Sequence, residues 1–114
     1  MPWLFDNPVS TGGLDNTAPN NAYTHCRVRM RDNDPDARSI ILLLEFGYMD
    51  GADFVKGALL PVGVDPSPVI SGDSWVALVT THTPNPGEKT YQAAKRGLYE
   101  FLVASGAIGP GQVT

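Results

Sequence analysis

The chain has 114 residues and a formal net charge of −4, with 42% apolar and 18% charged residues. This size suits one domain with a modest core, and the acidic balance disfavours general nucleic-acid binding, which needs a basic surface. No apolar run approaches the roughly 18 residues of a membrane span, and a single cysteine excludes an internal disulfide. Frequent Gly (12) and Pro (10) favour turns and extended segments over long helices.

Residues 1–22 differ in composition from the rest of the chain. They begin with the apolar cluster Trp3, Leu4 and Phe5 and continue with many Asn, Gly, Pro, Ser and Thr residues, which cannot form a core of their own. One interpretation is a disordered tail. The other is an extended N-terminal arm that anchors through the apolar cluster on a neighbouring subunit or on this chain, because exposing apolar surface costs about 25 cal/mol per Å².

Residues 23–48 predict a β-hairpin around a turn at residues 32–36. The first strand alternates between apolar and polar residues, whereas the second is apolar on both faces. If the pairing of the two strands shifted by one residue, arginines would lie on the apolar face. We therefore expect a well-defined register. The expected core pairs are Thr24 with Phe46, Cys26 with Leu44, Val28 with Leu42 and Met30 with Ile40. The pairs expected on the other face are His25 with Glu45, Arg27 with Leu43, Arg29 with Ile41 and Arg31 with Ser39.

The cationic row of His25, Arg27, Arg29 and Arg31 is the most specific polar feature of the chain. Two interpretations stay open. The arginine stems shield apolar neighbours while their charged groups remain in solvent, or the row docks on an acidic patch of a neighbouring subunit, where Arg is favoured. On the second interpretation, the row joins Trp3, Leu4 and Phe5 as interface residues.

Shorter elements are expected after the hairpin. A turn is predicted at residues 50–53, a strand at 54–60, a proline-rich loop at 61–68, and further strands at 69–70 and 75–80. A helix is predicted over about residues 86–105, with Asn85 as N-cap and Pro86 at its first position. Its apolar stripe consists of Tyr91, Ala94, Leu98, Phe101 and Leu102. Gly106 is expected to end it, and residues 106–114 are expected to form a flexible tail.

No motif in the chain predicts a metal site, a cofactor or catalysis. The acidic turn at residues 32–36 starts like a calcium loop, but Ala37 and Leu43 stand where that loop needs Gly and Glu. His25 and Cys26 are adjacent in a strand, so their side chains point to opposite faces of the sheet. They are therefore not expected to join His82 in one zinc site. We therefore expect Cys26 to be a small buried apolar residue, and we expect no enzyme.

These elements predict a mostly β, α+β fold. Residues 23–105 are expected to form an antiparallel β-sandwich or small barrel with one C-terminal helix, preceded by the extended N-terminal arm and followed by the tail. The arm, the short β-domain, the helical segment EKTYQAAKRGLY at residues 88–99 and the tail together resemble small virion structural proteins of tailed bacteriophages, of the minor tail, neck or capsid-decorating type.

The resemblance covers the whole chain and lies in its organisation. It implies a location in the virion, a structural role, and partners that are other copies of the chain and neighbouring virion proteins. The alternative is a small cytoplasmic enzyme or ligand-binding module with a pocket between helix and sheet, lined by Tyr91, Trp75 and Tyr48.

Overall fold

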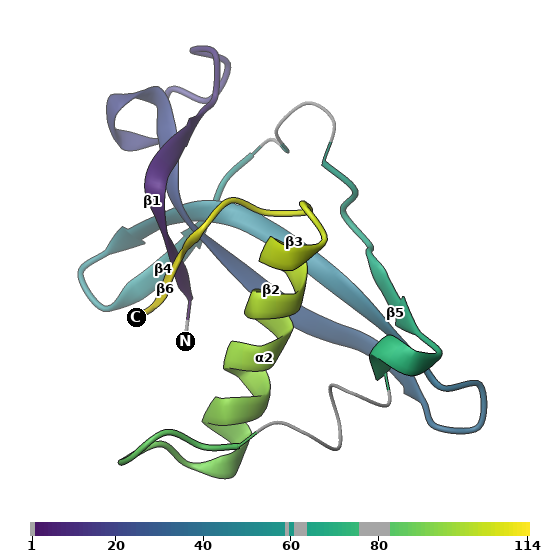
Figure 1. Cartoon of the computed structure of the whole chain (residues 1–114). Helices are drawn as coiled ribbons and strands as arrows, with labels where there is room; N and C mark the ends of the chain where they lie inside the picture. The colour runs from purple at the N-terminus through teal and green to yellow at the C-terminus, as the bar shows by residue number, and fades with distance from the viewer. Residues whose placement is uncertain (1, 59, 61–63, 76–82) are drawn as a thin grey trace.

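The computed structural model describes residues 2–58, 60, 64–75 and 83–114. Within these ranges the chain forms one six-stranded antiparallel sheet in the order β4-β3-β2-β1-β6, with β5 beside β3, and one long helix (Figure 1). The elements are β1 (Trp3–Ser10), η1 (Pro19–Asn21), β2 (Ala22–Asp34), β3 (Ser39–Asp50), β4 (Asp53–Lys56), β5 (Val69–Ser71), α2 (Thr90–Ala104) and β6 (Gly111–Val113). The prediction of a mostly β, α+β fold with a C-terminal helix is confirmed.

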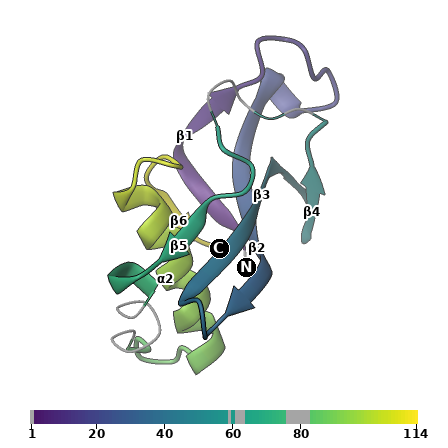
Figure 2. The same ribbon diagram turned by 90° about the vertical axis from the view of Figure 1, so that its right-hand side faces the viewer.

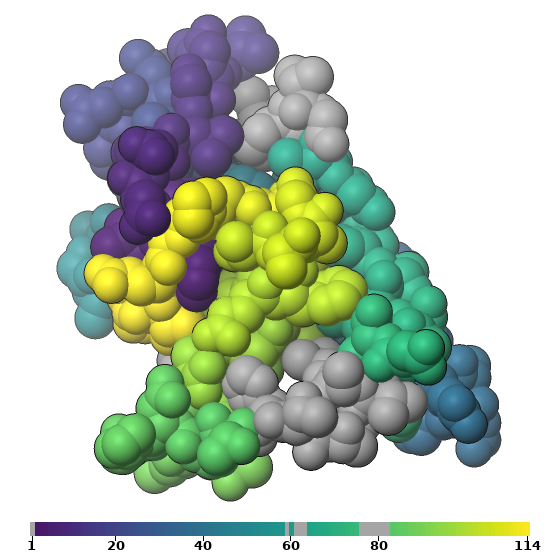
Figure 3. All heavy atoms as spheres, viewed as in Figure 1, coloured from purple at the N-terminus to yellow at the C-terminus, as the bar shows by residue number. Residues whose placement is uncertain are grey.

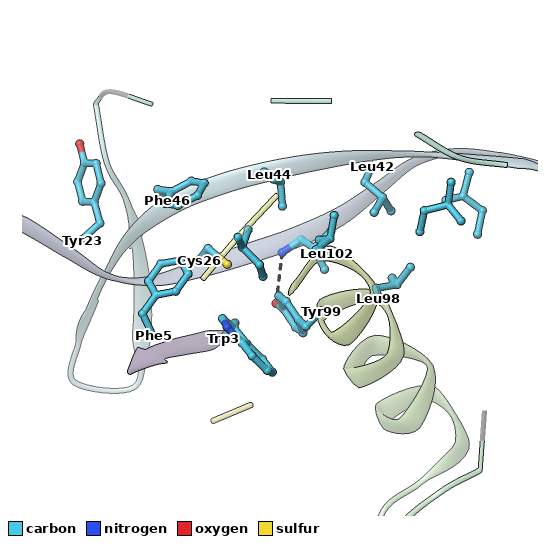
Figure 4. Close-up of a cluster of buried hydrophobic side chains, with 14 of the residues drawn as sticks. Trp3, Phe5, Tyr23, Cys26, Leu42, Leu44, Phe46, Leu98, Tyr99 and Leu102 are labelled. Carbon is cyan, nitrogen blue, oxygen red and sulfur yellow. Dashed lines mark hydrogen bonds between the residues drawn. The ribbon is translucent and has the colours of Figure 1, made fainter. Parts of the chain in front are cut away.

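Helix α2 lies against one face of the sheet, and the core fills the space between them (Figures 2 and 4). Two ring contacts tie the N-terminal strand into this core. Trp3 stacks on Tyr99 of the helix at 5.4 Å between centroids, and Phe5 stacks on Phe46 of β3 at 5.6 Å. The other buried side chains of β2, β3 and α2 in this cluster are Tyr23, Cys26, Val28, Ile40, Leu42, Leu44, Leu98 and Leu102.

The hairpin of β2 and β3 has the predicted faces but not the predicted register, and Met30, which was expected in the core, is 52% exposed. Cys26 lies opposite Phe46, and Val28 lies opposite Leu44, so the expected partners of residues 25–30 are wrong by two residues. A two-residue shift leaves every side chain on the same face. The shift arises because β2 continues to Asp34, which places the turn at residues 35–38 and displaces the pairs beside it by three residues. The irregularity between Met30 and Asp32 takes up one residue, so the displacement beyond it is two.

Both chain ends belong to the sheet. The predicted N-terminal arm contains β1, which pairs with β2 on one side and with β6 on the other. Residues 106–114 were expected to be flexible, and this is wrong: β6 lies there, Ile108 is buried, and the Thr114 N–H donates to the Pro2 carbonyl at 3.0 Å. The physical reason is that β1 has a second edge whose backbone groups need partners.

The helix begins later than predicted and ends as predicted. It starts at Thr90 rather than near residue 86, because Gly87 has a φ of +81° and residues 85–88 form a turn instead. At the other end, Gly106 adopts a φ of +80°, its N–H bonds to the Val103 carbonyl, and the Ala107 N–H bonds to the Leu102 carbonyl. This is a Schellman ending with glycine in the left-handed conformation.

The expectations for the segment between the hairpin and the helix have mixed outcomes. The turn between β3 and β4 is confirmed, with Asp50 opposite Asp53, and β5 agrees with the strand expected at residues 69–70. Strand β4 ends at Lys56 rather than at residue 60. Trp75 was expected to begin a strand but is helical together with residues 73 and 74. The remainder of that strand, residues 76–80, and His82 lie outside the described residues.

Candidate interaction surface

The sheet face opposite α2 carries the predicted cationic row. Side chains alternate along a strand, so the neighbours of the buried Cys26, Val28 and Leu44 point away from the helix. We call this surface the cationic face, and it consists of His25, Arg27, Arg29, Leu43, Glu45, Phe54 and Lys56.

A buried carboxylate organises the centre of the cationic face. Glu45 is 5% exposed, and its Oε1 accepts hydrogen bonds from Arg27 Nε at 3.0 Å and Nη2 at 2.7 Å. Lys56 Nζ lies 3.9 Å from the other carboxylate oxygen. The Arg27 guanidinium also lies 4.9 Å from the ring centroid of Phe54. Arg27 is thereby held in one position between an anion and an aromatic ring.

The sequence did not predict the partner of Glu45 correctly. His25 was expected opposite Glu45, but His25 lies opposite Gly47, and Arg27 takes the predicted place. The contribution of Lys56 was also missed, because the pairing of β4 with β3 could not be read from the alternation. The tight turn between these strands was the available signal, since it places Lys56 opposite Gly47, two residues from Glu45.

The residues of the cationic row have different environments. His25 is half-buried, its Nδ1 lies 2.6 Å from Thr24 Oγ1, and burial lowers its pKa below the usual 6.5. His25 is therefore uncharged at neutral pH. Arg27 is half-buried against Glu45, whereas Arg29 and Arg31 are exposed. The positive charge of the row is consequently concentrated toward the hairpin end.

Helix α2 closes the edge of β2 at Val28. The Val28 N–H donates to the Tyr99 hydroxyl at 3.2 Å, and Lys95 Nζ donates to the Val28 carbonyl. Burial lowers the pKa of Lys95, and the nearby charges of Arg27 and Arg29 add to this effect. Beyond Val28, residues 29–34 pair with β3 and with no other strand in the described part of the chain.

The expected anchor residues have different positions. Trp3 is 6% and Phe5 is 4% exposed, and both lie in the core of this chain. Leu4 is half-buried and lies between His25 of β2 and Gln112 of β6. Thus only Leu4 lies beside the cationic row. An interface role for these three residues stays a prediction, and for Trp3 and Phe5 it would require β1 to leave the core.

The space between helix and sheet is filled by the core (Figure 4). Of the three residues expected to line a pocket there, Tyr91 is 65% exposed, while Tyr48 and Trp75 are half-buried. A hollow of about 300 Å³ lies elsewhere, at the edge of β3 where β4 ends. It is lined by Leu43, Leu44, Glu45, Phe46, Lys56, Gly57, Ala58, Leu60 and Pro66.

Among the described residues, no three His, Cys, Asp or Glu side chains group as a metal site. No helix in that part of the chain has the length and apolar character needed to cross a membrane. A scan against protein-family models found no match, and searches of curated proteins and of solved structures found no significant match.

Proposed function

We propose that this protein is a structural, non-enzymatic subunit of a virion that joins neighbouring subunits. The observation that carries the proposal is the projecting end of the β2–β3 hairpin, residues 29–38, which we call the hairpin tip. Every residue of it is exposed, and it stands out from the body of the molecule (Figures 1 and 3). Strand β5 pairs with β3 at residues 39–41, so one edge of the hairpin is covered. The other edge, residues 29–34 of β2, has no strand partner in the described part of the chain, and a partner strand can add at such an edge.

The cationic face supports the same role. The helix covers the opposite face of the sheet, so this face is available for contacts. Arg27 is fixed by Glu45 and Phe54, and a side chain ordered in advance loses little entropy on binding. Arginine and aromatic side chains are also the residues enriched at protein interfaces. The location in a virion rests on the resemblance of the whole chain to small structural proteins of tailed bacteriophages.

The test compares the free chain with the chain in assembled particles. Hydrogen exchange and limited proteolysis should show protection of the hairpin tip in the particle relative to the free state. The helix end at residues 105–107 serves as internal reference. A chain that does not copurify with particles, or a hairpin tip with equal exchange in both states, would contradict the proposal.

The hollow beside β3 favours a second candidate function, binding of a small ligand. Its wall combines apolar side chains with the Glu45–Lys56 pair, a mixture typical of ligand sites. Leu60→Ala and Leu60→Trp should then weaken ligand binding in a small-molecule screen by calorimetry or NMR, whereas Leu14→Ala, at an 81% exposed side chain, should not. A screen without any binder would remove this candidate.

A further inference from the structure

The open edge of β2 has two defined limits. At its start, Tyr99 and Lys95 of α2 form hydrogen bonds with the backbone N–H and carbonyl of Val28. At its end, Pro35 follows β2 and has no N–H to donate. Residues 29–34 remain between these limits, and all of them are exposed. Backbone groups alternate between the two edges of a strand. Since the Val28 groups point away from β3, those of Met30 do so as well. The irregularity between Met30 and Asp32 shifts the alternation by one residue, so the groups of Asn33, opposite Ile40, also point away from β3.

The sequence of this open edge is complementary to itself. It reads Arg-Met-Arg-Asp-Asn-Asp. If two such segments pair antiparallel over their full length, Arg29 lies opposite Asp34 of the other copy, and Arg31 lies opposite its Asp32. Met30 then lies opposite Asn33. By symmetry each pair occurs twice, so every charged residue of the segment faces an opposite charge. Pairing over the full length of residues 29–34 therefore gives the same register in which opposite charges face each other.

These charges are available for such pairing. In the described part of the chain, Arg29, Arg31, Asp32 and Asp34 form no ion pair within 4.0 Å. Asp34 uses Oδ1 to accept the N–H groups of Asp36 and Ala37, which leaves Oδ2 for an arginine. Across the hairpin, Arg29 lies opposite Leu43 and Asp32 opposite Ile41, so neither has a charged partner within its own hairpin.

We infer that two copies of this chain associate by antiparallel pairing of residues 29–34 across a two-fold axis between Arg31 and Asp32. This names a partner for the assembly role proposed above and rests on it. The contact extends the sheet of one copy into that of the next by edge-to-edge strand addition. Its area is small, so the contact is weak in isolation and is strengthened where a particle holds many copies together.

A charge-exchange experiment on the isolated chain tests this inference. In Arg31→Asp the two central pairs become acid against acid, and in Asp32→Arg they become base against base. Each variant should self-associate about tenfold more weakly than the parent by sedimentation equilibrium, because two directly opposed pairs change from attraction to repulsion. An equimolar mixture of the two variants, and the double variant R31D/D32R, should both recover the association of the parent.

Matched controls change the same charges outside the paired segment. Arg38→Asp and Asp36→Arg lie in the turn and should leave self-association unchanged. A parent that is monomeric at every concentration would overturn the inference, since the edge charges would then only prevent aggregation. Single variants as associative as the parent, or a mixture that fails to recover association, would overturn it equally.

A cross-linking measurement is independent of the charge variants. The proposed register places Met30 opposite Asn33 of the second copy, at the roughly 5.5 Å between Cα atoms that a disulfide tolerates. A mixture of Met30→Cys and Asn33→Cys chains should form a disulfide dimer on oxidation, and its absence would contradict the register.

Particle incorporation without self-pairing would overturn this inference alone, whereas self-pairing without particle incorporation would overturn only the role in the virion.

Discussion

The hydroxyl of Tyr99 accepts a hydrogen bond from the backbone N–H of Val28 at 3.2 Å. This contact joins α2 to β2 at the point where β1 no longer covers the edge of the strand, since β1 begins opposite Cys26. Tyr99 thus has two structural roles: its ring fills the core against Trp3, and its hydroxyl satisfies a strand edge. The helix therefore determines where the open edge of β2 begins.

Tyr99→Phe should lower the free energy of unfolding by about 1–3 kcal/mol, because the buried Val28 N–H loses its acceptor while the ring packing stays. Urea denaturation measures this change. Tyr91→Phe is the matched control, since Tyr91 is 65% exposed, and its stability should equal that of the parent. Equal stability of the two variants would show that the hydroxyl contributes nothing to the fold.

Gly47→Ala should destabilise the sheet, because an added Cβ would lie 1.9 Å from the Val55 carbonyl oxygen. That atom belongs to the backbone of β4, so the strand itself would have to move. We expect a loss of about 1–3 kcal/mol in thermal or chemical unfolding, as for other overpacked sites. In Gly109→Ala the nearest atom would lie 3.9 Å away, and this control should unfold like the parent.

Asp15 should make the stability of the protein depend on acid pH. Its carboxylate is 3% exposed and accepts hydrogen bonds from Thr17, from the Tyr23 hydroxyl at 2.6 Å and from the Ala58 N–H at 3.0 Å. The hydrogen bonds from Thr17 and Tyr23 chiefly hold the pKa of Asp15 well below its usual 3.8.

A carboxyl whose pKa is depressed on folding stabilises the protein fully above its unfolded pKa. The contribution of Asp15 should therefore be complete at neutral pH and should decline as pH falls below about 4. Asp15→Asn should be less stable than the parent at pH 7 and should lose less stability on acidification, as measured by urea denaturation at several pH values. The exposed Asp36→Asn should follow the parent curve. Parallel curves for parent and Asp15→Asn would refute the prediction.

Cys26 should be unreactive in the folded protein. Its side chain is buried, and burial raises the pKa of the thiol to about 12, so almost no thiolate exists at pH 8. Labelling with a thiol reagent should therefore occur only on unfolding, with a midpoint in urea equal to that seen by circular dichroism. Rapid labelling without denaturant would contradict the buried position.

Local pattern in the sequence determined which side of each hairpin strand faces the core. The alternation from Tyr23 to Arg29 and the apolar residues of β3 required that assignment, since the side-chain period of a strand is two. Gly106 likewise determined the end of α2, because only a residue tolerant of positive φ ends a helix in that way. Both depend on interactions within a few residues.

Only the tertiary structure decided the register, the partners of Glu45 and the position of Trp3 and Phe5. A register shift by two residues preserves every face, so alternation could not distinguish the observed pairing from the expected one. The docking of β1 depends on backbone and ring partners far along the chain, among them Tyr99 and β6. The composition of residues 1–22 indicated that the aromatic rings need cover, but the covering surface forms only when distant segments come together.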